Sequence, residues 1–259
     1  MQFSFLSRLD AWQLMLILLV LMIISILIGL AAGKKFYRKS EIDATVLGSL
    51  FTLLGLLLAF TFSMSVSYHG MRRDIIIEEA NDIGTAILRA DLYRETDRDL
   101  LRTDFKKYVD ARIEFFTAGT DIEKVMAAQQ LSGNIQQQLW NRAAQLSKDS
   151  GYTVASMQMI PALNSMIDIT TTRKYSNLVH LPDTIIYLLL LLSCTCAFYI
   201  GYMFAGKGKF DWVMVIVFSL LTSMVVFVIF DLDRPRRGFI TLDSMNNAII
   251  ELKQQFQEK

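Results

Sequence analysis

The side chains best placed for chemistry in this sequence recur along one apolar stretch, residues 46–68. Small or hydroxylated residues return there at steps of three and four, which places them on one face of a helix. Such a stripe can let helix backbones approach and hydrogen-bond across a contact. It can also line a hydrated passage in which phenylalanine forms a hydrophobic constriction. Both interpretations stay open, and the candidates for lining a passage are Ser49, Thr52, Gly55, Ala59, Phe62 and Ser63.

An acidic cluster beyond this stretch occupies about one and a half helical turns. Its oxygen atoms could hold a hard cation, or they could form a ring of negative charge in an oligomer. They could equally form ion pairs with Arg72 and Arg73, which lie just before them. The cluster consists of Glu78, Glu79, Asn81 and Asp82.

A string of charges comes directly after the last apolar stretch. Arginines in such a position can bind lipid phosphates, and a neighbouring carboxylate can pair with one of them. We expect Pro235 to end the preceding helix. A membrane-surface anchor therefore explains the string without catalysis. Its charged residues are Asp231, Asp233, Arg234, Arg236 and Arg237.

The sequence carries no signature of an enzyme. It has no phosphate-binding glycine loop, HExxH, GxSxG or CxxC pair. Its two histidines are too few for a histidine-rich metal site, and a net charge of +1 leaves no basic excess for a nucleic-acid partner. We therefore expect a protein that is not an enzyme, with no catalytic residue, cofactor, metal or nucleic acid.

Charge distribution predicts the elements that must position these residues. Of 259 residues 53% are hydrophobic, and four stretches contain no Asp, Glu, Lys or Arg. An ionised side chain at a bilayer centre costs at least about 2.5–3.5 kcal/mol, and about 20 helical residues cross the hydrocarbon core. The sequence thus predicts a multi-pass protein of the lipid bilayer. Its expected spans are residues 12–32, 46–68, 184–206 and 212–230.

The predicted fold is all-α, with a helical-bundle soluble domain inserted between spans two and three. The domains are expected at 1–68 (a transmembrane hairpin), 69–183 (the soluble domain), 184–230 (a second hairpin) and 231–259 (a basic juxtamembrane tail with an amphipathic helix). Four spans place both termini and the soluble domain on one side of the membrane. Lys and Arg are nearly balanced between the two sides, which leaves both orientations open.

Helical spacing also predicts the core of the inserted domain. No strong breaker follows span two except Gly70, so this span should continue as one long helix. Further along, Gly119 is expected to close a helix, Thr120 to cap the next, and Pro161 to break a later one. The residues expected to be buried between helices include Ile76, Ile83, Ile87, Phe105 and Tyr108.

Several strings in the sequence resemble the bacterial bestrophin-like domain family, and together they cover nearly the whole chain. The most specific is DLDRPRRG at residues 231–238. The others are LGLLLAFTFS at 54–63, EEANDIGTA at 78–86, LRADL at 88–92 and YVDAR at 108–112. The resemblance implies kinship with bestrophins, which are oligomeric anion channels with four spans and a large helical insertion between spans two and three.

The resemblance implies a homo-oligomer in a bacterial plasma (inner) membrane, with a channel or channel-like passage for inorganic ions. The alternative is a non-conducting membrane scaffold or sensor whose helical domain binds a partner. The insertion is cytosolic in bestrophins, whereas the basic first loop of this family, seen here at Lys34, Lys35, Arg38 and Lys39, would put it outside. The resemblance therefore leaves both orientations open as well.

Overall fold

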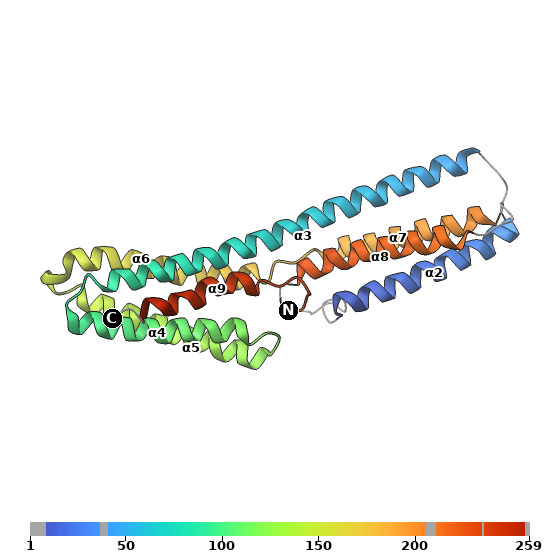
Figure 1. The fold of residues 1–259 in the computed structure, drawn as a ribbon. Helices are drawn as coiled ribbons and strands as arrows, with labels where there is room; N and C mark the ends of the chain where they lie inside the picture. Colours follow the sequence, from blue (N-terminus) through green and yellow to red (C-terminus); the bar gives the residue numbers. More distant parts are fainter. Residues whose placement is uncertain (1–8, 37–40, 206–210, 235, 257–259) are drawn as a thin grey trace. The chain divides into compact units, whose positions relative to one another are not determined.

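The structure, a computed structural model, describes residues 9–36, 41–205, 211–234 and 236–256. The described residues form helices joined by turns and loops, with no β-strand among them (Figure 1). The chain divides into two compact units. The first comprises the residues up to His69, His180–Arg234 and Gly238–Ile240, and the second comprises Gly70–Val179, residues 235–237 and Thr241–Lys259.

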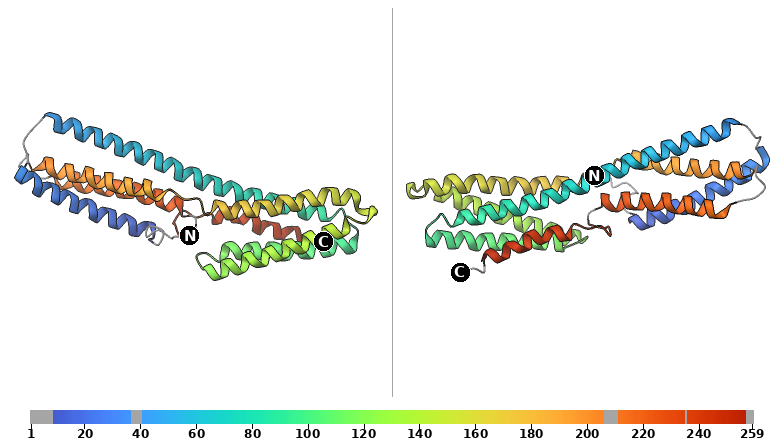
Figure 2. Two further views of the ribbon diagram at one scale, coloured as in Figure 1. Left: turned by 180° about the vertical axis from the view of Figure 1, so that it is seen from behind. Right: turned by 45° about the horizontal axis from the view of Figure 1, so that its top comes forward.

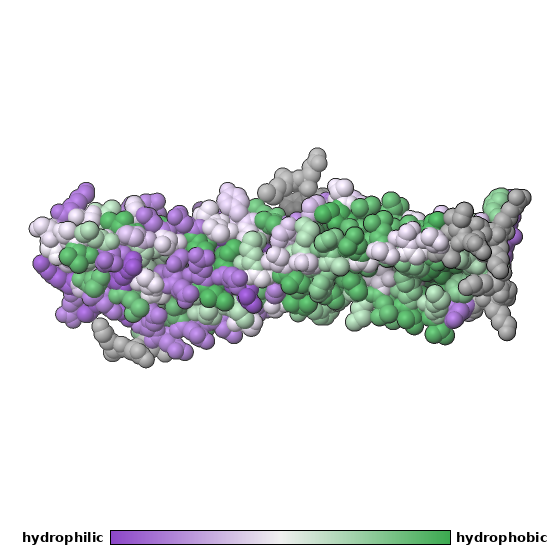
Figure 3. All heavy atoms as spheres, turned by 90° about the horizontal axis from the view of Figure 1, so that it is seen from above, coloured by the Kyte–Doolittle hydropathy of each residue, from purple (hydrophilic) through white to green (hydrophobic). Residues whose placement is uncertain are grey.

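Four helices in the described part of the chain are long and apolar enough to cross a membrane. They are α2 (Ala11–Phe36), α3 (Glu41–Ala90, apolar in its first half), α7 (Asp183–Phe204) and α8 (Trp212–Asp233). On the face shown in Figure 3, hydrophobic residues predominate over the part of the chain that these helices form, with more polar residues among them. The all-helical prediction with four candidate spans is confirmed. Helix α3 also runs without a break through Gly70, as the sequence predicts.

Helices α2 and α7 of the first unit pack with their backbones in direct contact. A Cβ atom added at Gly29 would lie 2.0 Å from the Phe198 carbonyl oxygen, and one added at Gly201 would lie 1.9 Å from that of Ile26. Only glycine permits this approach, which is how small residues bring membrane helices together. The small-residue pattern indicated such a contact in the second apolar stretch, residues 46–68, and did not indicate this one.

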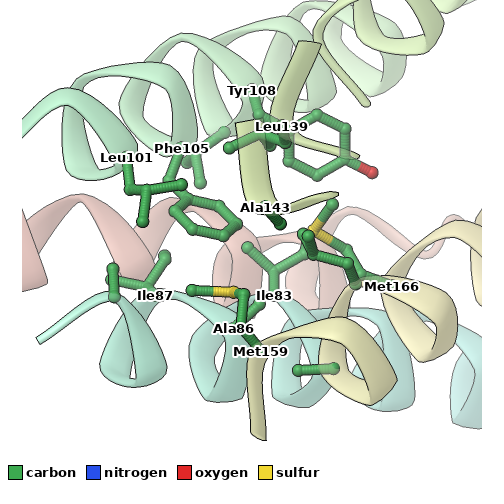
Figure 4. Packing of buried hydrophobic residues seen from close by; sticks show 14 of the residues in the cluster. Ile83, Ala86, Ile87, Leu101, Phe105, Tyr108, Leu139, Ala143, Met159 and Met166 are labelled. Carbon is green, nitrogen blue, oxygen red and sulfur yellow. The ribbon is translucent and has the colours of Figure 1, made fainter. Parts of the chain in front are cut away.

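The second unit is a bundle formed by the charged half of α3 together with four more helices. These are α4 (Glu95–Thr117), α5 (Ile122–Leu146), α6 (Thr153–Ser176) and α9 (Asp243–Glu251), with short 3₁₀ turns at Ser150–Tyr152 and Leu252–Phe256. Their apolar faces meet in one core, as Figure 4 shows. The predicted burial of Ile76, Ile83, Ile87, Phe105 and Tyr108 is confirmed.

Local helix signals in the bundle were predicted with mixed success. Gly119 follows α4 with a positive φ of 56°, as expected for a residue that closes a helix. The cap of α5 is Asp121 and not Thr120, because the Asp121 carboxylate accepts the Lys124 N–H. Pro161 does not break α6. Proline has no N–H group, so Pro161 cannot donate the helical hydrogen bond to the Met157 carbonyl oxygen. Both residues lie on the exposed face of α6, so the hydrogen bond is lost outside the core.

The C-terminal tail differs from the predicted separate juxtamembrane segment. Helix α9 packs beside α4 in the second unit (Figure 2). Ile249 and Leu252 are buried in the bundle core, and Asn246 is buried as well. The apolar face of the predicted amphipathic helix is therefore covered by protein.

Candidate functional site

One edge of the apolar half of α3 packs within the first unit. Leu54 is buried against Leu192 and Cys196 of α7. The Phe51 ring meets the Phe218 ring of α8 edge to face, with 5.3 Å between the centroids. These contacts set the rotation of α3 about its own axis, and thereby decide which of its residues point away from the unit.

The six candidate lining residues are all exposed in the single chain. At about 100° per residue, Ser49, Thr52, Ala59 and Ser63 lie about 140–180° from Leu54. They therefore share the face opposite the packed edge. Gly55 and Phe62 lie about 80–100° from Leu54, on one flank of that face. The structure thus brings four of the candidates together and sets two beside them.

The hydroxyl groups on this face are bonded within α3. Ser49 Oγ donates to the Val46 carbonyl oxygen at 2.8 Å, and Thr52 Oγ1 donates to that of Gly48 at 2.9 Å. Each hydroxyl oxygen can still accept or share a hydrogen bond on its outer side. The face therefore carries hydroxyl groups and no ionised group, and the exposed Leu56 lies on it as well. Hydroxyl groups suit contact with a hydrated ion or with another helix.

The residues of the acidic cluster, at the start of the second unit, lie on different sides of α3 and differ in burial. Glu78 and Asn81 are exposed and Asp82 is half-buried, whereas the Glu79 side chain is fully buried. Neighbouring residues on a helix point about 100° apart, so adjacent acids can face opposite environments. The four residues therefore do not form one cation site or a single water-facing ring.

Glu79 binds two arginines from other helices. Its Oε1 accepts from Arg112 Nε of α4 and its Oε2 from an Arg173 terminal nitrogen of α6, both at 2.5 Å. Burial acts to raise the pKa of Glu79, but the two guanidinium groups outweigh it and lower the pKa below its ordinary value. The predicted partners Arg72 and Arg73 were wrong for Glu79. The true partners lie 33 and 94 residues away, so no local sequence signal indicated them.

Three arginines surround the Phe115 ring beside this carboxylate. The guanidinium carbons of Arg112 and Arg236 lie 4.6 Å from the ring centroid, and that of Arg173 lies 5.7 Å from it. Arg173 also donates to Asn246 Oδ1 of α9 at 2.7 Å. The cluster therefore joins α3, α4, α6 and α9 through one buried charge network.

The two aspartates at the end of α8 accept hydrogen bonds from backbone N–H groups of the first unit. Asp231 accepts the N–H groups of Phe239 and Ile240 at 2.9 and 2.7 Å, and Asp233 accepts the Leu181 N–H at 3.1 Å. These bonds hold the segments that enter α7 and leave α8. The carboxylates, expected as arginine partners, thus act as backbone acceptors.

The nearby arginines occupy different environments. The Arg234 guanidinium lies over the Phe230 ring with 5.3 Å to its centroid, and Arg237 is exposed. Arg236 lies within the second unit, where it donates to the Gly119 carbonyl oxygen at 3.0 Å, so its guanidinium is not a free membrane-surface charge. Pro235 lies outside the described residues.

Comparison with solved structures shows the fold of the whole chain. It matches crystal structures of two point mutants of a bacterial bestrophin homolog from Klebsiella pneumoniae, at 13% and 12% sequence identity. The TM-scores are 0.68 and 0.67, and each match covers 95% of this chain and 98% of the other. No curated protein matches the sequence significantly.

The sequence itself also matches a family model. The model is described as the Bestrophin-like domain, and the match extends over residues 14–245. These residues include the exposed face of α3, the buried Glu79 cluster and the aspartates that end α8. The match covers most of the chain, and the resemblance drawn from its strings is confirmed: this protein belongs to the Bestrophin-like domain family.

Proposed function

We propose that this chain is the subunit of a homo-oligomeric ion channel in a bacterial plasma membrane, with α3 lining the passage. Membership of the Bestrophin-like family supports the proposal, as do the four helices able to cross a membrane. The second unit then acts as the soluble domain inserted between spans two and three. Conduction needs no chemical step, and the proposed function is not enzymatic.

The observation that carries the proposal is the row of small and hydroxylated side chains on the face of α3 opposite its packed edge. Ser49, Thr52 and Ser63 are exposed there. The outward residues of α7 and α8 include large apolar side chains such as Leu191, at 65% exposed, and Val213, at 72% exposed. Apolar faces suit lipid, whereas a hydroxylated face suits water or a second helix. An oligomer that gathers copies of α3 around an axis satisfies both preferences.

The lining then works by partial replacement of an ion's hydration shell. Serine and threonine oxygens offer weak, uncharged contacts, which let an ion bind and also leave. Phe62 lies at the flank of the same face, where rings from several subunits can form a hydrophobic constriction that empties of water. Inorganic ions are the expected cargo.

The test is current through planar bilayers containing the purified oligomer. Wild type should conduct, and Ser63→Trp should abolish current because the indole fills the passage at a position opposite the packed edge. Leu191→Trp is the matched control, since it adds the same bulk to an exposed position of α7 and should leave the current unchanged. Oligomer mass is measured for all three proteins.

A folded wild-type oligomer that passes no current under any ion gradient or voltage would overturn the channel proposal. The alternative, a non-conducting scaffold or sensor, would then take its place. Full current in Ser63→Trp with unchanged oligomer mass would instead remove α3 from the lining.

A further inference from the structure

A cavity of about 130 Å³ lies inside the second unit, where α3, α4, α6 and α9 meet. Its lining includes the side chains of Arg72, Arg173, Arg236 and Asn246. One water molecule takes about 30 Å³ in the liquid, so the cavity has room for a group of several non-hydrogen atoms. A tetrahedral oxyanion is of this size.

Positive charge around the cavity exceeds negative charge. Among the described residues that line it, Asp243 is the one carboxylate. Glu79 lies behind the lining with both oxygens already bound, one to Arg112 and one to Arg173. The three guanidinium groups of Arg112, Arg173 and Arg236 therefore accompany the two carboxylates of Glu79 and Asp243.

Arg236 lines the cavity and is held there by backbone oxygens. Its terminal nitrogen donates to the carbonyl oxygens of Gly119 and Phe115, and no carboxylate pairs with it among the described residues. Burial lowers the pKa of Arg236, and the positive charges of Arg173 and Arg112 lower it further. An anion in the cavity would relieve this repulsion, because it would supply the missing negative charge.

The N-terminus of α9 opens on the same cavity. Thr241, Leu242 and Asp243 belong to the lining, and Leu242, the N-cap residue, provides no side-chain hydrogen bond to the first turn. The first N–H groups of a helix lack partners within the helix and carry partial positive charge. Helix N-termini and arginine forks are the two devices by which proteins most often bind phosphate.

We propose that this cavity binds a dianionic phosphate group, either free or as the end of a phosphomonoester. The forked donors of Arg236 and Arg173 meet its oxygens, and the first turn of α9 supplies further N–H donors. The phosphate group supplies negative charge where guanidinium groups outnumber carboxylates. Binding would also tie α9 to α6 and to the end of α4. The inference goes beyond the proposed channel and is tested without current, so it holds or fails independently.

The test is phosphate binding by the full chain in detergent, by equilibrium dialysis and by melting temperature at constant ionic strength. Wild type should bind about one inorganic phosphate per chain saturably. Arg236→Gln should bind at least tenfold more weakly, whereas Arg237→Gln removes the same charge from the next, exposed residue and should bind as wild type does. The same measurement with glycerol phosphate distinguishes the two sources of the phosphate group. A phosphomonoester site should bind glycerol phosphate at least as tightly as inorganic phosphate, whereas a site for free phosphate should bind it more weakly.

A second variant tests the charge balance in the opposite direction. Asp243→Asn removes the negative charge from the lining and should tighten phosphate binding severalfold. The absence of saturable binding by wild type would overturn the proposal. An equal decrease of the melting temperature by Arg236→Gln in chloride and in phosphate would also overturn the proposal. That result would assign Arg236 a purely structural role.

Discussion

At the scale of single residues, the important finding is that adjacent acids have different roles. Glu78 faces outward, whereas Glu79 is buried between Arg112 and Arg173. Removing one partner of a buried ion pair is costly, because it leaves an uncompensated charge in the interior. Glu79 is therefore a structural centre of the bundle and not part of an acidic ring.

Glu79→Gln should destabilise the second unit by about 3–5 kcal/mol, because two buried guanidinium groups would then face a neutral amide. Glu78→Gln, the neighbouring exposed position, should change stability by no more than about 0.5 kcal/mol. Denaturant unfolding of the purified chain in detergent, followed by circular dichroism, measures both. Equal stability of the two variants would show that the Glu79 carboxylate does not hold the arginines.

The pH dependence of this difference has a definite sign. The pKa of Glu79 in the folded chain is lowered from its ordinary value of 4.5. Its stabilisation is therefore complete above that ordinary value and is lost as the pH falls through the lower folded-state pKa. The stability gap between wild type and Glu79→Gln should be the same at pH 6 and pH 8, and should narrow only in acid.

At the scale of elements, the contact between α2 and α7 depends on glycine residues, which have no side chain. Gly201→Ala should destabilise the chain by about 1–3 kcal/mol or more, because the new methyl group collides with backbone at Ile26. Gly48→Ala places the same methyl group in open space on α3. There the better helix propensity of alanine should make the change neutral or slightly stabilising.

Thermal unfolding in detergent compares the two glycine variants. A loss of stability is expected in Gly201→Ala only, and unchanged stability in that variant would contradict the packing of α2 on α7. The face of α3 is a related case. Helical spacing grouped its small residues, but the contact of Leu54 with α7 determined which of them point away from the unit.

At the scale of the whole molecule, α9 restricts how the chain crosses the membrane. Helix α9 and α4 belong to one bundle, although α7 and α8 lie between them in the sequence. If the bundle lies on one side of the membrane, as we propose, an even number of crossings separates Val179 from Thr241. Helices α7 and α8 are the two candidate spans in that interval.

Cysteine labelling in sealed vesicles tests this topology. With Cys194 and Cys196 replaced by alanine, cysteines at Asn134 and Ser244 should react from one side with a membrane-impermeant reagent. A cysteine at Asp211, between α7 and α8, should react only from the other side. All three positions are exposed in the structure. Reaction of Asn134→Cys and Ser244→Cys from opposite sides would exclude the two-crossing arrangement.

The sequence was sufficient for those features that depend on local physics. Exclusion of charge from hydrocarbon located the four apolar helices, and the period of 3.6 residues identified Ile83, Ile87 and Phe105 as buried. The continuity of α3 followed from the lack of a strong breaker after span two. Each of these features depends on residues within a few turns of one another.

Tertiary structure decided which helical faces meet. The partners of Glu79 lie 33 and 94 residues away, and the glycine contact joins α2 to α7 across more than half of the chain. The path of α9 into the bundle likewise placed Arg236 and Asn246 beside Arg173, which formed the cavity. Periodicity reports that a face is apolar or polar, but it does not report what covers that face. Pairing depends on the packing of several helices at once, and no local pattern in the sequence carries that information.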